Sequence, residues 1–545
     1  MRKNSLTAAF LIIILSFPAW GNVNRYMVFF TDKNGGAYSI DNPEEFLSIR
    51  ALQRRNKQNI DIVTNDLPVS DTYLDALLAL DNIQVYFTTK WMNGVLVEMD
   101  EESKNELEIL SFIDKIDLVA PGKKLSSSPE NGRKTTVRKS FATSEDKIES
   151  KAQNELIGVD AMHEAGYRGE GMLVAVFDSG FDFIDESSYF AHVFNNNKIK
   201  GTKDFVHGSS DVYQFDSHGS KVLSCIVAYK ESEYSGTAPE SNLVLCVTED
   251  VTSEYRIEEY NWLFAAEYAD SIGVDILNSS VGYSYFDDEN MNYTYDDLDG
   301  KTAVISRAAT FAASKGMLVV SSVGNEGNNT WQYLNAPADA DSILSVGSVT
   351  YDLERSSFSS FGPTSDGRIK PDVSTLGSWV KIVYKDEITY ANGTSFSAPL
   401  VTGLAAGFWQ AYPDLTNMEV IQYLKITASQ ANAPDTIIGF GVPNFIKAFN
   451  KVKINEGDVV NKFVVFPNPV TNKRIIYLYI DSLAGNGHAN LNFYDLKGSY
   501  IRSEKLQVNN VFNPIEVDVS FLKPGSYIIT YVHGHEEKKS KLVVL

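Results

Sequence analysis

The sequence predicts an α/β protein of several domains, the central one built on a parallel β-sheet, because 545 residues are too many for one hydrophobic core. Apolar and β-branched runs recur in the centre without the alternation of a half-exposed strand, and a polar residue follows each. Strands of a parallel sheet show this pattern because helices cover both of its faces. A mixed helix and strand pattern precedes this region and an all-strand pattern follows it. The central runs are 173–177, 243–247, 317–320 and 343–349.

Residues 1–21 have the features of a secretory signal peptide. Basic Arg2 and Lys3 precede an apolar run at 8–17, and small residues follow at Ala19 and Gly21. This run is shorter than the roughly 20 residues that span a bilayer, so a cleaved signal is favoured over a membrane anchor.

Residues 22–122 are predicted to form a small α/β domain. Its expected elements are strands at 26–30, 83–88 and 95–99 and helices at 43–55, 70–80 and 103–110. Residues 123–150 are rich in Ser, Thr, Lys and Arg and poor in large apolar side chains, which predicts a linker without a core of its own. We expect maturation to cut the chain between Lys123 and Lys151.

Three segments of the central region, 151–455, carry groups suited to nucleophilic catalysis. Asp178 follows the apolar run 173–177, His218 opens a segment with helical apolar spacing, and Ser395 lies at the exit of a small-residue turn. The chain order Asp, His, Ser differs from the orders of α/β-hydrolase and chymotrypsin-like triads. A fourth group, Asn325, lies in the turn Gly324-Asn325-Glu326-Gly327 after the run 317–320, where its amide can donate to an oxyanion.

With these motifs the chain resembles the subtilisin-like serine peptidases over about residues 155–450. The resemblance implies a triad of Asp178, His218 and Ser395, with Asn325 and the Ser395 amide as the oxyanion hole. It also implies that Asn335 lies near the floor of the first specificity pocket, with an ordinary loop asparagine as the alternative. The substrate-binding residues that it implies are Ser280, Val281, Gly282, Ser321, Ser322, Val323 and Gly324.

The resemblance gives the terminal domains expected roles. The position of 22–122 between signal and catalytic domain is that of an inhibitory, fold-assisting propeptide, and an accessory domain is the alternative. Residues 460–545 show short strands and turns that predict a β-sandwich. Their Phe466-Pro-Asn-Pro469 motif and their terminal Lys541–Leu545 run resemble the C-terminal sorting domain of the type IX secretion system of Bacteroidetes. A sandwich that binds carbohydrate or protein is the alternative. The expected strands are 475–480, 489–494, 514–519, 526–532 and 541–545.

Composition excludes some functions. A net charge of −22 argues against a nucleic-acid surface, which needs a basic face. The two cysteines, Cys225 and Cys246, are compatible with a disulfide or with two buried thiols. No metal-ligand motif is present, so we expect no cofactor; a structural calcium ion is compatible with the resemblance, without nameable ligands.

These observations predict a secreted serine endopeptidase, made as a zymogen and exported through the periplasm and outer membrane of a Bacteroidetes-type bacterium. Its expected partners are protein or peptide substrates, its own propeptide and the type IX secretion machinery. The alternative is a surface binding or adhesion protein whose subtilisin-like domain no longer cleaves.

Overall fold

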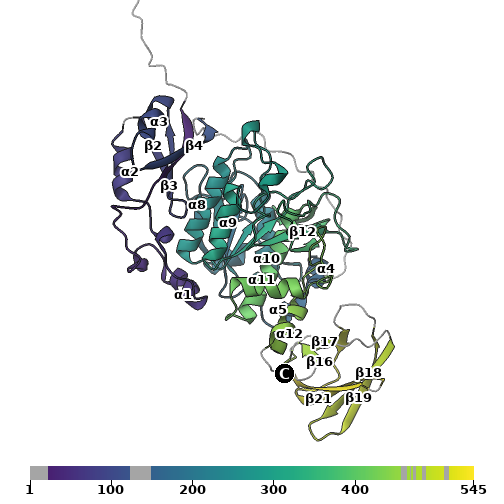
Figure 1. The fold of residues 1–545 in the computed structure, drawn as a ribbon. Helices are drawn as coiled ribbons and strands as arrows, with labels where there is room; N and C mark the ends of the chain where they lie inside the picture. The colour runs from purple at the N-terminus through teal and green to yellow at the C-terminus, as the bar shows by residue number, and fades with distance from the viewer. Residues whose placement is uncertain are drawn as a thin grey trace, which may run out of the picture.

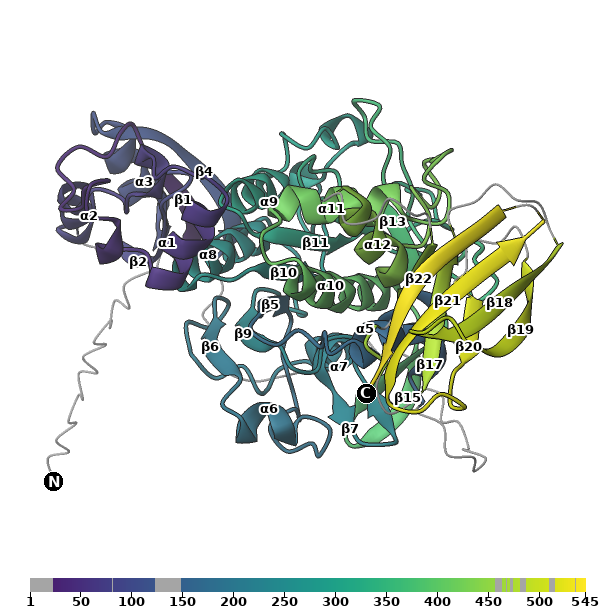
Figure 2. The same cartoon turned by 90° about the horizontal axis from the view of Figure 1, so that it is seen from below.

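The computed structural model describes residues 23–80, 82–122, 149–455, 463–466, 468–470, 474–480, 487–508, 515–534 and 536–545. The predicted signal peptide and nearly all of the predicted linker lie outside these residues. Figures 1 and 2 show an N-terminal domain and a C-terminal domain at opposite ends of a larger central domain. Within the described residues, no helix is both long and apolar enough to cross a membrane.

The central domain contains the predicted parallel sheet. Seven strands pair in the order β13-β12-β11-β10-β5-β9-β6, and all their pairings are parallel. Three of these strands were not predicted: the edge strand β6 is largely polar, and β10 and β13 have only four residues each. The strands are β5 (Leu173–Asp178), β6 (Ile199–Asp204), β9 (Asn242–Val247), β10 (Ile276–Ser279), β11 (Leu318–Ser322), β12 (Leu344–Val349) and β13 (Val373–Leu376).

Helices cover both faces of this sheet, which explains its unbroken apolar runs. Val174 and Val176 of β5 share one core with α7 (His218–Val227) and α10 (Thr394–Ala411). Ala175 and Phe177 share a second core with α8 (Ile257–Ile272) and α9 (Val304–Ser314). The remaining helices and short strands are α4 (Lys151–Leu156), α5 (Val159–Glu164), α6 (Ala191–Asn195), α11 (Asn417–Ile426), α12 (Phe445–Asn455), β7 (Tyr229–Lys230), β8 (Tyr234–Ser235), β14 (Val380–Tyr384) and β15 (Glu387–Ala391).

The two cysteines lie in these separate cores. Both Cys225 and Cys246 are buried and free, which excludes the disulfide alternative. Burial raises the pKa of Cys225 to about 12, so its thiol is unsuited to nucleophilic chemistry.

The N-terminal domain is a four-stranded antiparallel sheet, ordered β2-β3-β1-β4, with helices packed around it. The helix expected at 43–55 is instead a 3₁₀ turn followed by a separate helix, because the Ser48 hydroxyl accepts a hydrogen bond from the Ala51 amide at 3.2 Å and caps a new start. The strand β4 was not predicted. The elements are β1 (Asn24–Phe30), α1 (Ile49–Lys57), α2 (Asp71–Leu78), β2 (Gln84–Thr89), β3 (Gly94–Met99), α3 (Glu101–Glu108) and β4 (Ile113–Pro121).

The C-terminal domain consists of two antiparallel sheets that share one apolar core, which confirms the predicted strand-rich domain. The first sheet has the order β16-β17-β20 and the second β19-β18-β21-β22. The polar strand β19 was not predicted. The strands are β16 (Phe463–Phe466), β17 (Ile475–Ile480), β18 (Gly487–Asp495), β19 (Tyr500–Val508), β20 (Ile515–Asp518), β21 (Gly525–His533) and β22 (Glu536–Val544).

Candidate active site

The four candidate catalytic residues lie at the carboxyl edge of the central sheet. Asp178 is the last residue of β5, and Asn325 follows β11. His218 is the first residue of α7, and Ser395 is the second of α10. In parallel sheets the strand ends and the following helix starts share one edge, which is where such folds place their functional groups.

Asp178 holds the imidazole of His218. Its Oδ1 atom accepts a hydrogen bond from His218 Nδ1 at 2.8 Å and another from the Ser179 amide at 2.8 Å. The side chain of Asp178 is fully buried, and its Oδ2 atom accepts no hydrogen bond from the described residues. The preceding residue, Phe177, packs edge-on against Trp262, with 5.5 Å between the ring centroids, and this contact holds the end of the strand. The carboxylate therefore faces the imidazole from a dry environment.

A second carboxylate, Asp216, lies beside the pair. It accepts hydrogen bonds from the His218 amide at 2.8 Å and from the Ser179 hydroxyl at 3.0 Å. Burial lowers the pKa of His218, but the charge and hydrogen bond of Asp178 and the charge of Asp216 outweigh that effect, so the pKa lies above its usual value. The site thus favours the imidazolium form, which a general base must reach during catalysis.

Ser395 is tied to Ser280 by two reciprocal hydrogen bonds. The Ser395 hydroxyl donates to the Ser280 carbonyl at 3.3 Å, and the Ser280 hydroxyl donates to the Ser395 carbonyl at 3.0 Å. Asn278 donates to the Ser280 hydroxyl at 3.1 Å. No hydrogen bond joins Ser395 to His218 among the residues that the structure describes. Before the Ser395 hydroxyl can pass its proton to the imidazole, it must break its hydrogen bond to the Ser280 carbonyl and form one to His218.

Asn325 presents its amide nitrogen to solvent beside the nucleophile. Its Oδ1 atom accepts hydrogen bonds from the Thr394 amide at 2.9 Å and the Thr394 hydroxyl at 3.1 Å, which leaves Nδ2 free to donate. Gly393 has a φ of 149°, and a Cβ placed on it would lie 3.7 Å from that Nδ2 atom. A glycine at this position therefore keeps the space beside the amide open, next to the positive end of α10.

The seven predicted substrate-binding residues divide into two groups. Val281, Gly282 and Gly324 are partly exposed, whereas the other four are buried. Val323, for example, belongs to a small apolar cluster with Trp331 and Leu334. Any substrate contact from this buried group would be made by the backbone. Its members are Ser280, Ser321, Ser322 and Val323.

Asn335 lies between the two predicted pocket segments. A Cβ added to Gly282 would lie 3.2 Å from the Asn335 Cβ, and one added to Gly324 would lie 2.9 Å from its Nδ2. The side chain is buried, and its Oδ1 atom has no hydrogen-bond partner in the described part of the chain. Asn335 thus contacts both predicted segments, and its place at the pocket floor stays a prediction.

Sequence reasoning did not single out Asp216, Ser179 or Thr394 as parts of the site. Each lies within two residues of a residue that was selected, and this proximity is the signal that could have identified them. In the described ranges, no group of three His, Cys, Asp or Glu side chains is arranged to hold a metal ion. The acidic loop at 287–299 uses several carboxylates as caps of its own turns; Asp299, for example, accepts from the amides of Lys301 and Thr302 at 2.7 Å. The expectation of no cofactor and the calcium ion that is compatible with the resemblance both stay untested.

Comparisons with known proteins identify the family of the central domain and of the two terminal domains. Residues 169–441 match the model of the subtilase family, residues 25–136 the peptidase S8 propeptide domain of Bacteroidota, and residues 464–545 the secretion system C-terminal sorting domain. The chain belongs to the subtilase family, and it carries the propeptide and sorting domains predicted at its two ends.

Two named relatives are similar over the central domain. Subtilisin from Bacillus pumilus is 32% identical over 277 residues, which are 50% of this chain and 89% of the relative. Subtilisin NAT from Bacillus subtilis subsp. natto is 31% identical over 277 residues, 50% of this chain but only 64% of the relative. A solved protease structure from Pseudoalteromonas arctica aligns with a TM-score of 0.44 and 21% identity over 56% of this chain and 98% of that one, a likeness too weak to carry an argument.

Proposed function

We propose that this protein is a secreted serine endopeptidase that cleaves peptide bonds through an acyl-enzyme. The observation that carries the proposal is the buried Asp178–His218 hydrogen bond at 2.8 Å, at the same sheet edge as Ser395 and the free amide of Asn325. A buried carboxylate, an imidazole, a hydroxyl and an amide donor are the four groups that acyl transfer requires.

In the proposed reaction, Ser395 Oγ attacks the carbonyl carbon of a peptide while His218 Nε2 takes the hydroxyl proton. Asp178 stabilises the imidazolium that forms and fixes its tautomer. Asn325 Nδ2 and the Ser395 amide donate to the oxyanion of the tetrahedral intermediate. His218 then returns the proton to the leaving amine as the carbon–nitrogen bond breaks, and water hydrolyses the ester by the same steps.

The peptide would bind in an extended conformation along 280–282 and 321–324, mainly through backbone hydrogen bonds. Asn335 would contribute a polar group to the pocket for the residue that precedes the cut. Backbone recognition of this kind predicts a permissive enzyme whose preference is set by few side chains.

The terminal domains support a proposed route to the cell exterior. The N-terminal domain would inhibit the enzyme until the chain is cut between Lys123 and Lys151, and the C-terminal domain would engage the type IX secretion machinery. The mature enzyme would then be released from, or attached to, the surface of a Bacteroidetes-type bacterium.

Hydrolysis of labelled casein by the secreted, processed protein tests the proposal, with a serine-directed fluorophosphonate as an active-site label. Wild type should cleave casein and take the label, and Ser395→Ala should do neither. Ser397→Ala, which removes a buried hydroxyl of the same motif that donates to the Thr375 carbonyl at 3.3 Å, should still take the label. Folded, processed wild type that neither cleaves nor takes the label would instead favour the surface binding protein.

A further inference from the structure

The N-terminal domain contacts the catalytic domain in two distinct places. The first is the face of its sheet, where Met27, Trp91 and Leu96 share an apolar core with α8 and α9. The second is the segment 48–66, which contains α1 and reaches along the catalytic domain away from that sheet (Figure 1). The two contacts differ in chemistry. The first is apolar apart from the buried Glu267 carboxylate of α8, which accepts hydrogen bonds from the Thr89 hydroxyl and the Lys90 and Trp91 amides. The second is built mainly from charged side chains.

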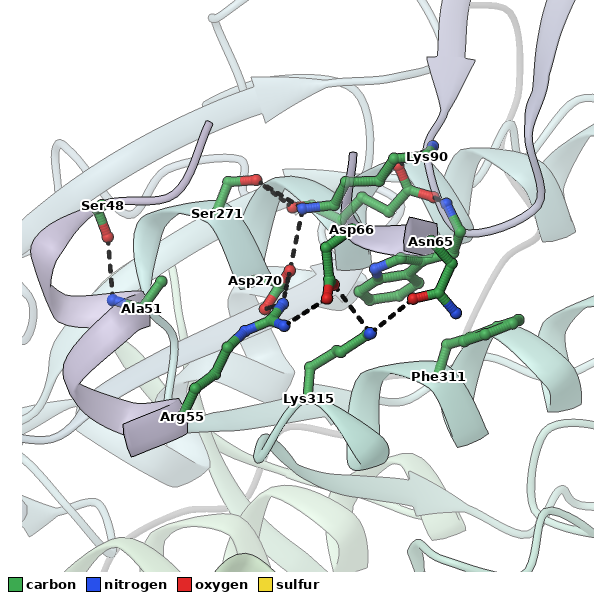
Figure 3. Close-up of polar contacts among 12 residues, drawn as sticks. Ser48, Ala51, Arg55, Asn65, Asp66, Lys90, Asp270, Ser271, Phe311 and Lys315 are labelled. Carbon is green, nitrogen blue, oxygen red and sulfur yellow. Dashed lines mark hydrogen bonds and ion pairs between the residues drawn. The ribbon is translucent and has the colours of Figure 1, made fainter. Parts of the chain in front are cut away.

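Asp270 of α8 is the centre of the charged contact. Arg54 Nη2 lies 2.6 Å from its Oδ1, while Arg55 Nη2 and Lys90 Nζ lie 2.8 Å and 3.0 Å from its Oδ2. Figure 3 shows Arg55 and Lys90 converging on this carboxylate. All three cations come from the N-terminal domain: Arg54 and Arg55 belong to the segment 48–66, and Lys90 comes from the turn between β2 and β3. Within the described residues, the Asp270 carboxylate has no partner from its own domain.

Lys315 shows the same one-sided pairing with the opposite sign. Its Nζ atom lies 2.8 Å from Asp66 Oδ1 and donates to Asn65 Oδ1 at 2.9 Å, and both partners belong to the N-terminal domain. Arg55 connects the two centres, because its Nη1 lies 3.0 Å from Asp66 Oδ2 (Figure 3). Asp270 and Lys315 thus give the catalytic domain an anion and a cation whose described side-chain partners all lie across the boundary, and the same holds for the nearby Glu267 carboxylate.

The catalytic surface is also shaped to receive α1. Gly273 ends α8 with a φ of +96°, and a Cβ there would lie 2.6 Å from the Ala51 amide. Gly316 would place a Cβ 2.7 Å from Gln58 Nε2, which donates to the Gly316 carbonyl at 2.8 Å. Gln58 Oε1 in turn accepts from the Asn417 amide at 3.0 Å. A side chain at Gly273 would have to displace the backbone of α1, whereas one at Gly316 would displace the side chains of Gln58 and Ile60, which follow the helix.

We infer that the Asp270 and Lys315 cluster is a charge-specific anchor for α1, and that it sets how long the N-terminal domain stays bound after the linker is cut. The inference rests on the proposed propeptide role. Arg55, Asp66 and Asp270 have side chains at most 1% exposed. Removing one member of such a buried cluster leaves the others unpaired and dry, and this penalty appears mainly as faster dissociation. A half-exposed ion pair at the same boundary has no such penalty.

Helix α1 supplies a matched pair of variants for the test. Arg55→Gln and Arg50→Gln each remove one positive charge from the same helix and the same boundary. Arg55 is 1% exposed and belongs to the cluster, whereas Arg50 is 42% exposed and pairs with Asp275 outside it. Both changes are made in the full chain carrying Ser395→Ala, so the measurement needs no peptidase activity. The linker, rich in Lys and Arg, is cut with limiting trypsin, and release of the N-terminal fragment is followed after dilution by size-exclusion chromatography and mass spectrometry.

We expect Arg55→Gln to raise the release rate by about 30-fold or more and Arg50→Gln by about three-fold or less. Asp270→Asn, which leaves the N-terminal domain unaltered, should resemble Arg55→Gln, and the double variant should be less than additive because the two residues contact each other. If Arg55→Gln does not fold, the release rate of Asp270→Asn is compared with that of Arg50→Gln instead. The inference would be overturned if the cluster variants released the N-terminal fragment at rates within three-fold of wild type. The contact at the face of the sheet would then set the lifetime of the complex. A wild-type protein that shows no peptidase activity but releases its N-terminal fragment slowly would contradict the proposed function. The inference about the anchor would still stand.

Discussion

Thr394 fixes which end of the Asn325 side chain faces the substrate. Its amide and its hydroxyl both donate to Asn325 Oδ1, at 2.9 Å and 3.1 Å, so the amide nitrogen of Asn325 is the group left for an oxyanion. An exposed asparagine on a loop would otherwise sample both orientations. In the proposed mechanism, the residue before Ser395 therefore helps to prepare the oxyanion hole.

Replacing Asn325 should lower turnover and leave binding nearly unchanged. Asn325→Ala removes a donor that acts on the transition state, and loss of such a donor in subtilisin costs about 10²–10³-fold in kcat. Steady-state kinetics on a peptide substrate gives kcat and KM separately. Asn328→Ala, an exposed asparagine of the same loop, is the control and should keep wild-type values. A rise in KM with unchanged kcat in Asn325→Ala would contradict the assignment.

The pH dependence should report the environment of His218. The base works only when neutral, and its pKa lies above the ordinary value of 6.5, so activity should fall with decreasing pH at a midpoint above that value. Asp216→Asn should move the midpoint of kcat/KM toward lower pH, because Asp216 contributes to the increase through its charge. Asp211→Asn, at an exposed position in the preceding loop, should leave the midpoint in place. An unshifted midpoint in Asp216→Asn would remove this role from Asp216.

Gly393 should be essential for activity and not for folding. Its φ of 149° and ψ of 150° lie in a region that only glycine occupies readily, and a Cβ would fill the space beside Asn325 Nδ2. Gly393→Ala should lower kcat/KM by about 100-fold or more. Gly367→Ala, at a φ of +86° with no atom within 4 Å of the added Cβ, also places a side chain on a positive-φ backbone and should keep activity. Equal losses in the two variants would indicate a general effect of strain.

Glu259 should make the folded protein less stable as the pH rises. Its carboxylate accepts from the Tyr293 hydroxyl at 2.8 Å and from the Ile305 amide at 3.1 Å, and burial raises its pKa to about 7 from 4.5. Between these values the folded state keeps a proton that the unfolded state has lost. Raising the pH from 4.5 to 7 therefore removes about 3 kcal/mol of stability.

Thermal unfolding of Ser395→Ala with and without Glu259→Gln measures this effect. The glutamine cannot ionise, so the added substitution should stabilise the protein more at pH 8 than at pH 5. The difference between the two chains at each pH isolates Glu259 from the other buried acids. A Glu259→Gln effect that is the same at both pH values would show that Glu259 keeps no proton in the folded protein.

Much of the fold could be predicted from local patterns of apolar and polar residues. The apolar runs of β5, β9 and β11 and the small and apolar residues of β12 predicted a sheet buried on both faces, because a strand with one exposed face would alternate apolar and polar residues. Several strands were missed. The strands β6 and β19 are rich in charged and polar residues, charged residues interrupt β4, and β10 and β13 have only four residues each. Hydrogen bonds to neighbouring strands hold them in place.

By itself, the sequence determined the parallel-sheet architecture and selected Asp178, His218, Ser395 and Asn325, since each follows or opens an element whose pattern is local. Only the tertiary structure decided what each group contacts. In the folded chain the Ser395 hydroxyl donates to the Ser280 carbonyl, and Thr394 orients Asn325. The cations that bind Asp270 come from residues more than 170 positions away in the sequence. Such contacts depend on burial and on the close approach of segments that are distant in the sequence. Neither produces a periodic pattern of residues from which the contact could be predicted.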